Sequence, residues 1–147
     1  MISRGNKLRK KRILLVEDNC GDIELMKEVV LQGSFKYQLS IAKNGDNAIA
    51  YLNSLSEDKR KSLPDLILLD LNLPGKNGHE ILKEIKDDSR FRSIPVVILS
   101  SSDNERDVSR SYELNANSHV KKPRNLMEFA NILKIIESFW LNAAQLP

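Results

Sequence analysis

The 147-residue chain has few of the features that mark secreted, membrane or thiolate-metal proteins. It has one cysteine, Cys20, so no internal disulfide can form and no zinc cluster can be built from thiolates. No apolar run approaches about 18 residues, which excludes a transmembrane helix. Residues 1–12 hold many charges and no apolar core of a signal peptide. These absences predict a cytoplasmic protein, and the length predicts one domain without an added effector module.

Positive charge is concentrated at the start of the chain. Six of the cations that give the formal net charge of +3 are Arg4, Lys7, Arg9, Lys10, Lys11 and Arg12. Subtracting these six from +3 leaves about −3 for the remainder. Such an arm either binds nucleic acid or an acidic surface, or is a solvated tail. No aromatic residues interleave it and no helix-turn-helix pattern follows, so we expect a basic arm over 1–11 that makes no direct contact with nucleic acid.

Short apolar runs alternate with helical patterns along the chain. The expected strands are 13–16, 37–43, 65–70, 95–99 and 118–121. The expected helices carry apolar faces that include Ile23, Ala48, Ile81, Val108 and Phe129. The polar stretch 54–64 is predicted to be a loop. Because parallel strands need crossover helices, the pattern predicts an α/β fold: a doubly wound, five-stranded parallel sheet with five helices, over residues 12–141, with 142–147 as a tail.

Polar residues follow four of these strands. Glu17 and Asp18 follow the first strand, Asp70 ends the third, Ser100 follows the fourth, and Lys122 follows the fifth. Ligands of such sheets bind outside the carboxyl ends of the strands. We therefore expect these residues to meet at one edge of the sheet.

Three carboxylates brought together raise one another's pKa, and a hard divalent cation such as Mg²⁺ removes that conflict. Lys122 would supply a compact positive charge for phosphate oxygens, and Ser100 a hydroxyl donor. Asp70 lies between these groups and is the natural nucleophile, because an aspartate can form an acyl phosphate. Ser100 lies in a run of three serines, so local turn capping is an alternative role for it.

Four segments, 13–18, 65–78, 94–101 and 121–123, together resemble the receiver domains of bacterial two-component response regulators. The resemblance implies a flavodoxin-like (CheY-like) fold and covers nearly the whole chain. It implies that Asp70 is the phosphoacceptor of a sensor histidine kinase, and that Asp18 and Asp70 ligate Mg²⁺ through their side chains. Asn72 would ligate through its backbone carbonyl, and Glu17 through water.

The resemblance also implies roles for residues of the fourth and fifth strands. Ser100 would be the switch hydroxyl, and Lys122 the phosphate-binding lysine, with a cis bond to Pro123. Two positions depart from the family pattern: His119 stands where Tyr or Phe is usual, and Arg124 where Phe is frequent. Both fall on the surface where receivers usually signal. As a whole, the chain resembles the small stand-alone response regulators that are paired with phytochrome-type kinases.

Three other functions are weighed against a phosphoacceptor. A haloacid-dehalogenase-type phosphatase needs its nucleophile after the first strand and an aspartate two residues later, whereas Asn72 stands there. A nucleotide-binding module needs a glycine-rich loop after the first strand, where this chain has Glu17 and Asp18. A phosphorylation-independent docking receiver would not need every chemical position filled.

The last expected helix has two apolar stripes. Leu126, Phe129, Leu133, Ile136 and Trp140 form the core-facing stripe, and Ile132, Ile135 and Phe139 form a second one. The second stripe predicts a homodimer through the fourth helix, the fifth strand and the fifth helix, with completed packing against neighbouring helices as the alternative. His79, on the third helix, is expected to be exposed.

Overall fold

The computed structural model describes residues 11–32, 37–58, 60–101, 104–136 and 138–139. Its strands are β1 (Lys11–Val16), β2 (Tyr37–Ala42), β3 (Leu66–Asp70), β4 (Val96–Ser100) and β5 (Ser118–Lys121). Its helices are α2 (Cys20–Gln32), α3 (Gly45–Glu57), α4 (Gly78–Asp87), α5 (Glu105–Glu113) and α6 (Leu126–Ile136). The predicted arm over 1–11 lies outside the described residues except for Lys11, and the predicted tail lies wholly outside them.

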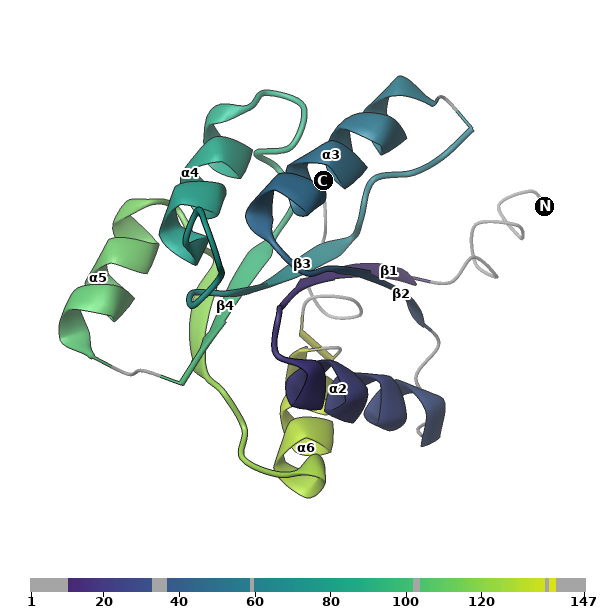
Figure 1. Ribbon diagram of the computed structural model, residues 1–147, viewed down its shortest axis with the longest axis vertical. Coiled ribbons are helices and arrows are strands. Elements are labelled where there is room, and N and C mark those ends of the chain that lie inside the picture. The colour runs from purple at the N-terminus through teal and green to yellow at the C-terminus, as the bar shows by residue number, and fades with distance from the viewer. Residues whose placement is uncertain (1–10, 33–36, 59, 102–103, 137, 140–147) are drawn as a thin grey trace.

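All strand pairs of the sheet are parallel, in the order β2-β1-β3-β4-β5. Helices α2 and α6 cover one face, and α3, α4 and α5 lie on the other (Figure 1). Strands β3 and β4 are buried along their whole length, as expected for strands covered on both faces. The predicted α/β class, the five strands and the five helices are confirmed.

The core has one layer on each face of the sheet. In β1, Leu14 and Val16 belong to the layer beneath α3 and α4, while Ile13 and Leu15 belong to the layer beneath α2 and α6. This division follows from the two-residue period of a strand. At about 25 cal/mol per Å² of apolar surface removed from water, these two layers supply the main force that holds the helices on the sheet.

Asparagines begin all five helices, and those before α2 and α6 accept from the Asp22 and Glu128 amides. Asn44 accepts a hydrogen bond from the Asn47 amide, and Asn77 forms a capping box with Glu80. Asn104 begins α5 in the same way, through the Arg106 amide. The predicted loop over 54–64 is wrong at its start, because α3 continues to Glu57. The polar face of 54–57 hid the helix, whose buried Leu55 continues the apolar face of α3.

The final helix matches the core-facing stripe where its side chains are described. Phe129, Leu133 and Ile136 are buried, whereas Ile135 and Phe139 of the second stripe are 64% and 54% exposed. The side chains of Leu126 and Trp140 lie outside the described residues. Within the described ranges, none of the helices has the length and apolarity needed to cross a bilayer.

Candidate functional site

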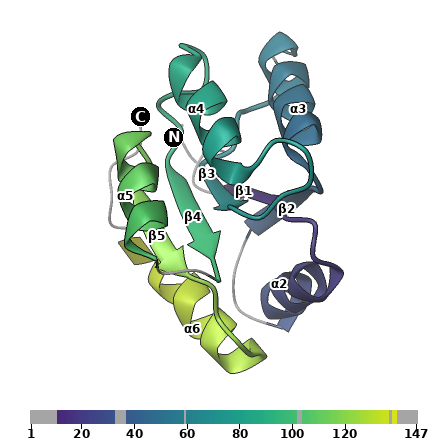
Figure 2. The same ribbon diagram turned by 60° about the vertical axis from the view of Figure 1, so that its left-hand side comes forward.

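The polar residues at the strand ends meet at one edge of the sheet, as predicted. Figure 2 shows β4 and β5 side by side with their carboxyl ends at the same edge. Asp70 pairs with Leu99 of β4, and Ser100 pairs with Lys121 of β5. The amide of Glu17 donates to the Ala42 carbonyl at 2.9 Å, which holds the residue after β1 against the end of β2. This edge contains the point where the strand order reverses between β1 and β3, the usual ligand position in such sheets.

Three carboxylates form the acidic part of the site. Glu17, Asp18 and Asp70 each place a carboxylate oxygen within 4.8 Å of the others. Glu17 and Asp70 are buried, at 2% and 4% exposure, while Asp18 is exposed. Hard oxygen donors at this separation are the chemistry that Mg²⁺ and related divalent cations prefer. The side chains present therefore fit the metal that the sequence predicts.

Lys122 supplies the positive charge at the centre of the cluster. Its Nζ lies 2.6 Å from Glu17 Oε1, 2.7 Å from Asp22 Oδ2 and 3.5 Å from Asp70 Oδ2. The Lys122 amide donates to the Ser100 carbonyl at 2.7 Å, which fixes the segment after β5 against the end of β4. Asp22 was not among the predicted site residues. The signal for it was available, because Asp22 lies in the first turn of the helix that follows the acidic pair.

Burial and hydrogen bonding oppose each other at these groups. Burial raises the pKa of Glu17 to about 7, and the nearby Asp70 carboxylate adds to this effect, although the Lys122 ammonium and the Asn19 amide act against it. For Lys122, burial alone would lower the pKa. Its hydrogen bonds with Asp22 and Glu17, together with the charge of Asp70, outweigh burial and raise the Lys122 pKa. Lys122 therefore stays protonated at neutral pH.

The loop after β3 is held closely around Asp70. The Asn72 amide lies 3.3 Å from Asp70 Oδ1, and the Gly78 amide donates to the Leu71 carbonyl at 2.9 Å. A Cβ atom on Gly78 would lie only 2.4 Å from the Asp70 carbonyl oxygen and 2.6 Å from Leu71 Cα. The start of α4 can approach Asp70 this closely because residue 78 is glycine.

The acidic cluster opens into a cleft of about 640 Å³. Its lining includes Asp18, Asp22, Asp70, Ser101, Lys122 and Arg124. Ser100 is fully buried at the end of β4, whereas the neighbouring Ser101 is exposed and lines the cleft. The prediction that Ser100 reaches the carboxyl edge is confirmed in position, and its role as the switch hydroxyl stays a prediction.

The predicted cis bond between Lys122 and Pro123 is wrong, since no cis peptide bond occurs along the described chain. The trans isomer is favoured by about 0.5–1 kcal/mol even before proline.

A second polar cluster joins α4, α5 and β5. Ser111 Oγ, which is fully buried, donates to the Asp107 carbonyl at 2.9 Å and lies 2.9 Å from both His79 Nε2 and His119 Nδ1. Because the hydroxyl has one proton and the carbonyl can only accept, both imidazoles donate their N–H to Ser111. The predicted exposure of His79 is wrong: it is half-buried, and burial lowers its pKa.

Known proteins with similar sequences are response regulators. The family model for the response regulator receiver domain matches residues 13–134. Response regulator Rcp1 of Synechocystis sp. (strain ATCC 27184 / PCC 6803 / Kazusa) is 45% identical over 137 residues, which is 93% of this chain and 93% of that protein.

Solved structures of response regulators have the same fold as this chain. The structure of the phosphorylated cyanobacterial phytochrome response regulator RcpA has a TM-score of 0.85 at 46% identity, covering 95% of this chain and 99% of that one. The Mn²⁺-bound form of Rcp1 has a TM-score of 0.80 at 45% identity, covering 93% and 99%. With an acidic cluster at the carboxyl edge of a 2-1-3-4-5 parallel sheet, the chain belongs to the response regulator receiver domain family, and is a signalling protein of two-component systems.

Proposed function

We propose that Asp70 accepts a phosphoryl group from the phosphohistidine of a sensor histidine kinase. The observation that carries the proposal is the position of the Asp70 carboxylate, which lies between two other carboxylates and the Lys122 ammonium at an open cleft. An Asp70 oxygen forms the new bond to phosphorus while the bond from phosphorus to the donor nitrogen breaks. The imidazole leaves with that electron pair, and its other nitrogen keeps or takes up a proton.

The residues of the cluster have separate parts in this transfer. Lys122 Nζ lies 3.5 Å from Asp70 Oδ2, so it is in reach of an oxygen on a phosphoryl group attached there. The Asn72 amide lies near Asp70 Oδ1 and orients the carboxylate. Asp18, Asp70 and the Asn72 carbonyl would hold Mg²⁺ directly, with Glu17 acting through water. Bound Mg²⁺ would neutralise the carboxylates and draw charge from the phosphoryl oxygens. Ser100 is proposed as the hydroxyl that responds to the phosphoryl group.

We propose a phytochrome-type kinase as the donor, because RcpA, at 46% identity, is a phytochrome response regulator. Because such a kinase phosphorylates its own histidine with ATP, we propose that the phosphoryl transfer to Asp70 takes place in the cytoplasm. The phosphatase alternative lacks support, since Asn72 replaces the aspartate that would act as its acid and base. Hydrolysis of small phosphate esters is therefore not expected beyond slow loss of the protein's own phosphoryl group.

The phosphoacceptor proposal is tested by intact-mass measurement after incubation with acetyl phosphate and Mg²⁺. We expect the mass of one added phosphoryl group on the wild type, none on Asp70→Asn, and full labelling of the matched control Asp87→Asn. Asp87 is an exposed α4 carboxylate whose surface ion pair with Lys83 contributes little. An unlabelled wild type, or an Asp70→Asn variant labelled like the wild type, would refute the proposal.

We further propose a homodimer through α5, β5 and α6. The support is an apolar surface around the 64%-exposed Ile135 and the 54%-exposed Phe139, where a shallow hollow of about 690 Å³ lies over α6. Sedimentation at micromolar concentration, with and without phosphorylation, should give a dimer in at least one state. Ile135→Glu and Phe139→Glu should reduce it, while Leu31→Glu, on exposed α2 surface, should not. A monomeric wild type in both states would contradict this proposal.

A further inference from the structure

Arg124 is a cation of the cleft with no partner inside the described part of the protein. It follows Pro123, is exposed and lines the same cleft as Asp70. Its guanidinium makes no hydrogen bond or ion pair to any residue that the structure describes. Its backbone is held in place, because the Arg124 amide donates to Glu128 Oε2 at 3.0 Å. The Arg124 backbone is therefore held at the cleft, while its guanidinium is available to bind a ligand.

Helix stability does not account for a cation at this position. Arg124 comes two residues before Leu126, the first residue of α6, where the partial positive charge of the helix dipole disfavours a cation. The helix start is already satisfied by other groups, because Asn125 Oδ1 accepts from the Glu128 amide at 2.9 Å. The arginine side chain therefore adds nothing to the capping of α6.

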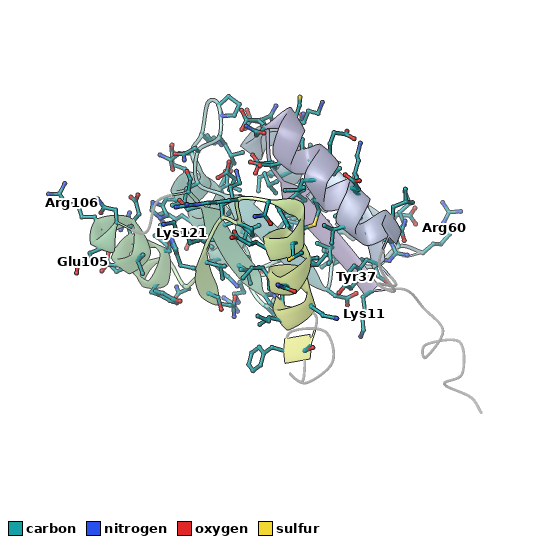
Figure 3. All side chains as sticks on the ribbon, turned by 90° about the horizontal axis from the view of Figure 1, so that it is seen from below. Lys11, Tyr37, Arg60, Glu105, Arg106 and Lys121 are labelled. Carbon is teal, nitrogen blue, oxygen red and sulfur yellow. The ribbon has the colours of Figure 1, made fainter. Side chains whose placement is uncertain are left out.

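The electrostatics of the cleft give a reason for a further cation. Four carboxylates, those of Glu17, Asp18, Asp22 and Asp70, face one ammonium, which already contacts three of them. With Lys122 and a bound Mg²⁺, the four carboxylates would still leave a net charge of about −1 (−4 + 1 + 2), so the cluster repels an incoming anionic phosphoryl donor before any transfer begins. Lys121, labelled at the end of β5 in Figure 3, also lines the cleft, but it takes part in another interaction.

We propose that Arg124 recognises the phosphoryl donor: its guanidinium binds oxygens of the incoming dianionic group and offsets repulsion by the carboxylates. The planar guanidinium presents paired N–H donors that match phosphate oxygens, which suits it to this role better than an ammonium. Arg124 changes no bond in the reaction and is a positioning residue. The inference rests on the proposed role of Asp70 as phosphoacceptor.

Two small donors of different charge separate recognition from chemistry. With acetyl phosphate, an Asp70 oxygen bonds to phosphorus, the phosphorus–oxygen bond to the acetyl group breaks, and acetate leaves without needing a proton. With phosphoramidate, the phosphorus–nitrogen bond breaks, and the nitrogen, which is already protonated, leaves as ammonia. Acetyl phosphate is a dianion at neutral pH, whereas phosphoramidate carries one fewer net negative charge. Loss of a recognising cation should therefore slow the first donor more than the second.

The test measures the labelling rate of Arg124→Ala, Arg124→Lys and Arg124→Glu with both donors in Mg²⁺. With acetyl phosphate we expect a fall of roughly three- to tenfold for the alanine variant and a larger one for glutamate, with partial recovery in lysine. With phosphoramidate the fall should stay below about twofold for alanine. Raising the salt concentration should slow the wild type more than Arg124→Ala with acetyl phosphate.

Arg92→Glu is the matched control, because Arg92 is an exposed arginine that precedes β4 and so lies toward the opposite edge of the sheet. Ions of the buffer screen exposed charges that lie more than about 10 Å apart at 0.1 M ionic strength. The labelling rate of Arg92→Glu should therefore match that of the wild type within about twofold with both donors. Equal rate changes for both donors, or an Arg124→Glu variant as fast as the wild type, would overturn the inference while leaving Asp70 as phosphoacceptor. A wild type that takes no phosphoryl group from either donor would overturn both.

Discussion

Gly78→Ala is the substitution whose effect follows most directly from the geometry around Asp70. The added Cβ would lie 2.4 Å from the Asp70 carbonyl oxygen, 2.6 Å from Leu71 Cα and 3.1 Å from the Asp70 carbonyl carbon. All three are backbone atoms, so no side-chain rotation can make room. The start of α4 must move away from the end of β3.

The size of the effect comes from two opposed contributions. Alanine in place of glycine in a helix is favoured by up to about 1 kcal/mol. Overpacking against well-packed atoms costs about 1–3 kcal/mol, and separating the elements would also weaken the 2.9 Å hydrogen bond from the Gly78 amide to the Leu71 carbonyl. We expect Gly78→Ala to lower the free energy of unfolding by about 1–3 kcal/mol and to slow phosphoryl labelling of Asp70.

Urea denaturation followed by circular dichroism measures the first effect, and intact-mass labelling the second. Gly21→Ala is the control, because its Cβ would meet only the Asn19 side chain, at 3.2 Å, on an exposed turn of α2. That variant should be as stable as the wild type or more stable by up to about 1 kcal/mol, because the helical preference for alanine acts there without the clash. A Gly78→Ala variant with wild-type stability and labelling rate would refute the claim that this close approach holds Asp70 in place.

Three further predictions concern the two polar clusters. Burial raises the pKa of Glu17 to about 7, above its ordinary 4.5. The contribution of protonated Glu17 to the stability of the metal-free protein is therefore full below pH 4.5 and lost as the pH rises through about 7. Thermal melts in EDTA should show this decline for the wild type but not for Glu17→Gln. Asp18→Ala should lose Mg²⁺ affinity in calorimetry while keeping or gaining thermal stability, because it relieves carboxylate repulsion; a large fall in melting temperature with intact Mg²⁺ binding would contradict this. Ser111→Ala removes the oxygen to which His79 and His119 both donate, so the free energy of unfolding in urea should fall by about 1–3 kcal/mol, and unchanged stability would argue against the shared hydrogen bonds.

The sequence predicts the parts of the fold and site that depend on chain order. Apolar runs with intervening helical patterns are sufficient for a parallel sheet, and the carboxyl ends of its strands must share an edge. Glu17, Asp18, Asp70 and Lys122 were predicted to lie together on this ground, and the structure confirms the cluster.

Side-chain contacts between distant segments were not predictable in the same way. The hydrogen bond from His79 to Ser111 joins residues 32 apart on two helices, and no periodicity reports such a pairing. The end of α3 was missed because residues 54, 56 and 57 are polar, and only the buried Leu55 continues the apolar face there. Likewise, the local sequence cannot distinguish Ser100 from Ser101. Ser100 is the last residue of β4 and is buried, whereas Ser101 follows the strand and lines the cleft, and this depends on where the strand ends.

Borohydride trapping tests the central claim, that Asp70 forms an acyl phosphate, most directly. After labelling with acetyl phosphate and Mg²⁺, hydride reduces an aspartyl phosphate to homoserine with loss of phosphate. Trypsin releases the peptide 62–76, which contains both Asp65 and Asp70, so Asp65 serves as an internal control. Fragment-ion sequencing should find homoserine at position 70 and aspartate at position 65, and no homoserine in the Asp70→Asn variant. Homoserine at position 65 or elsewhere in the chain, or none in the labelled wild type, would contradict the account.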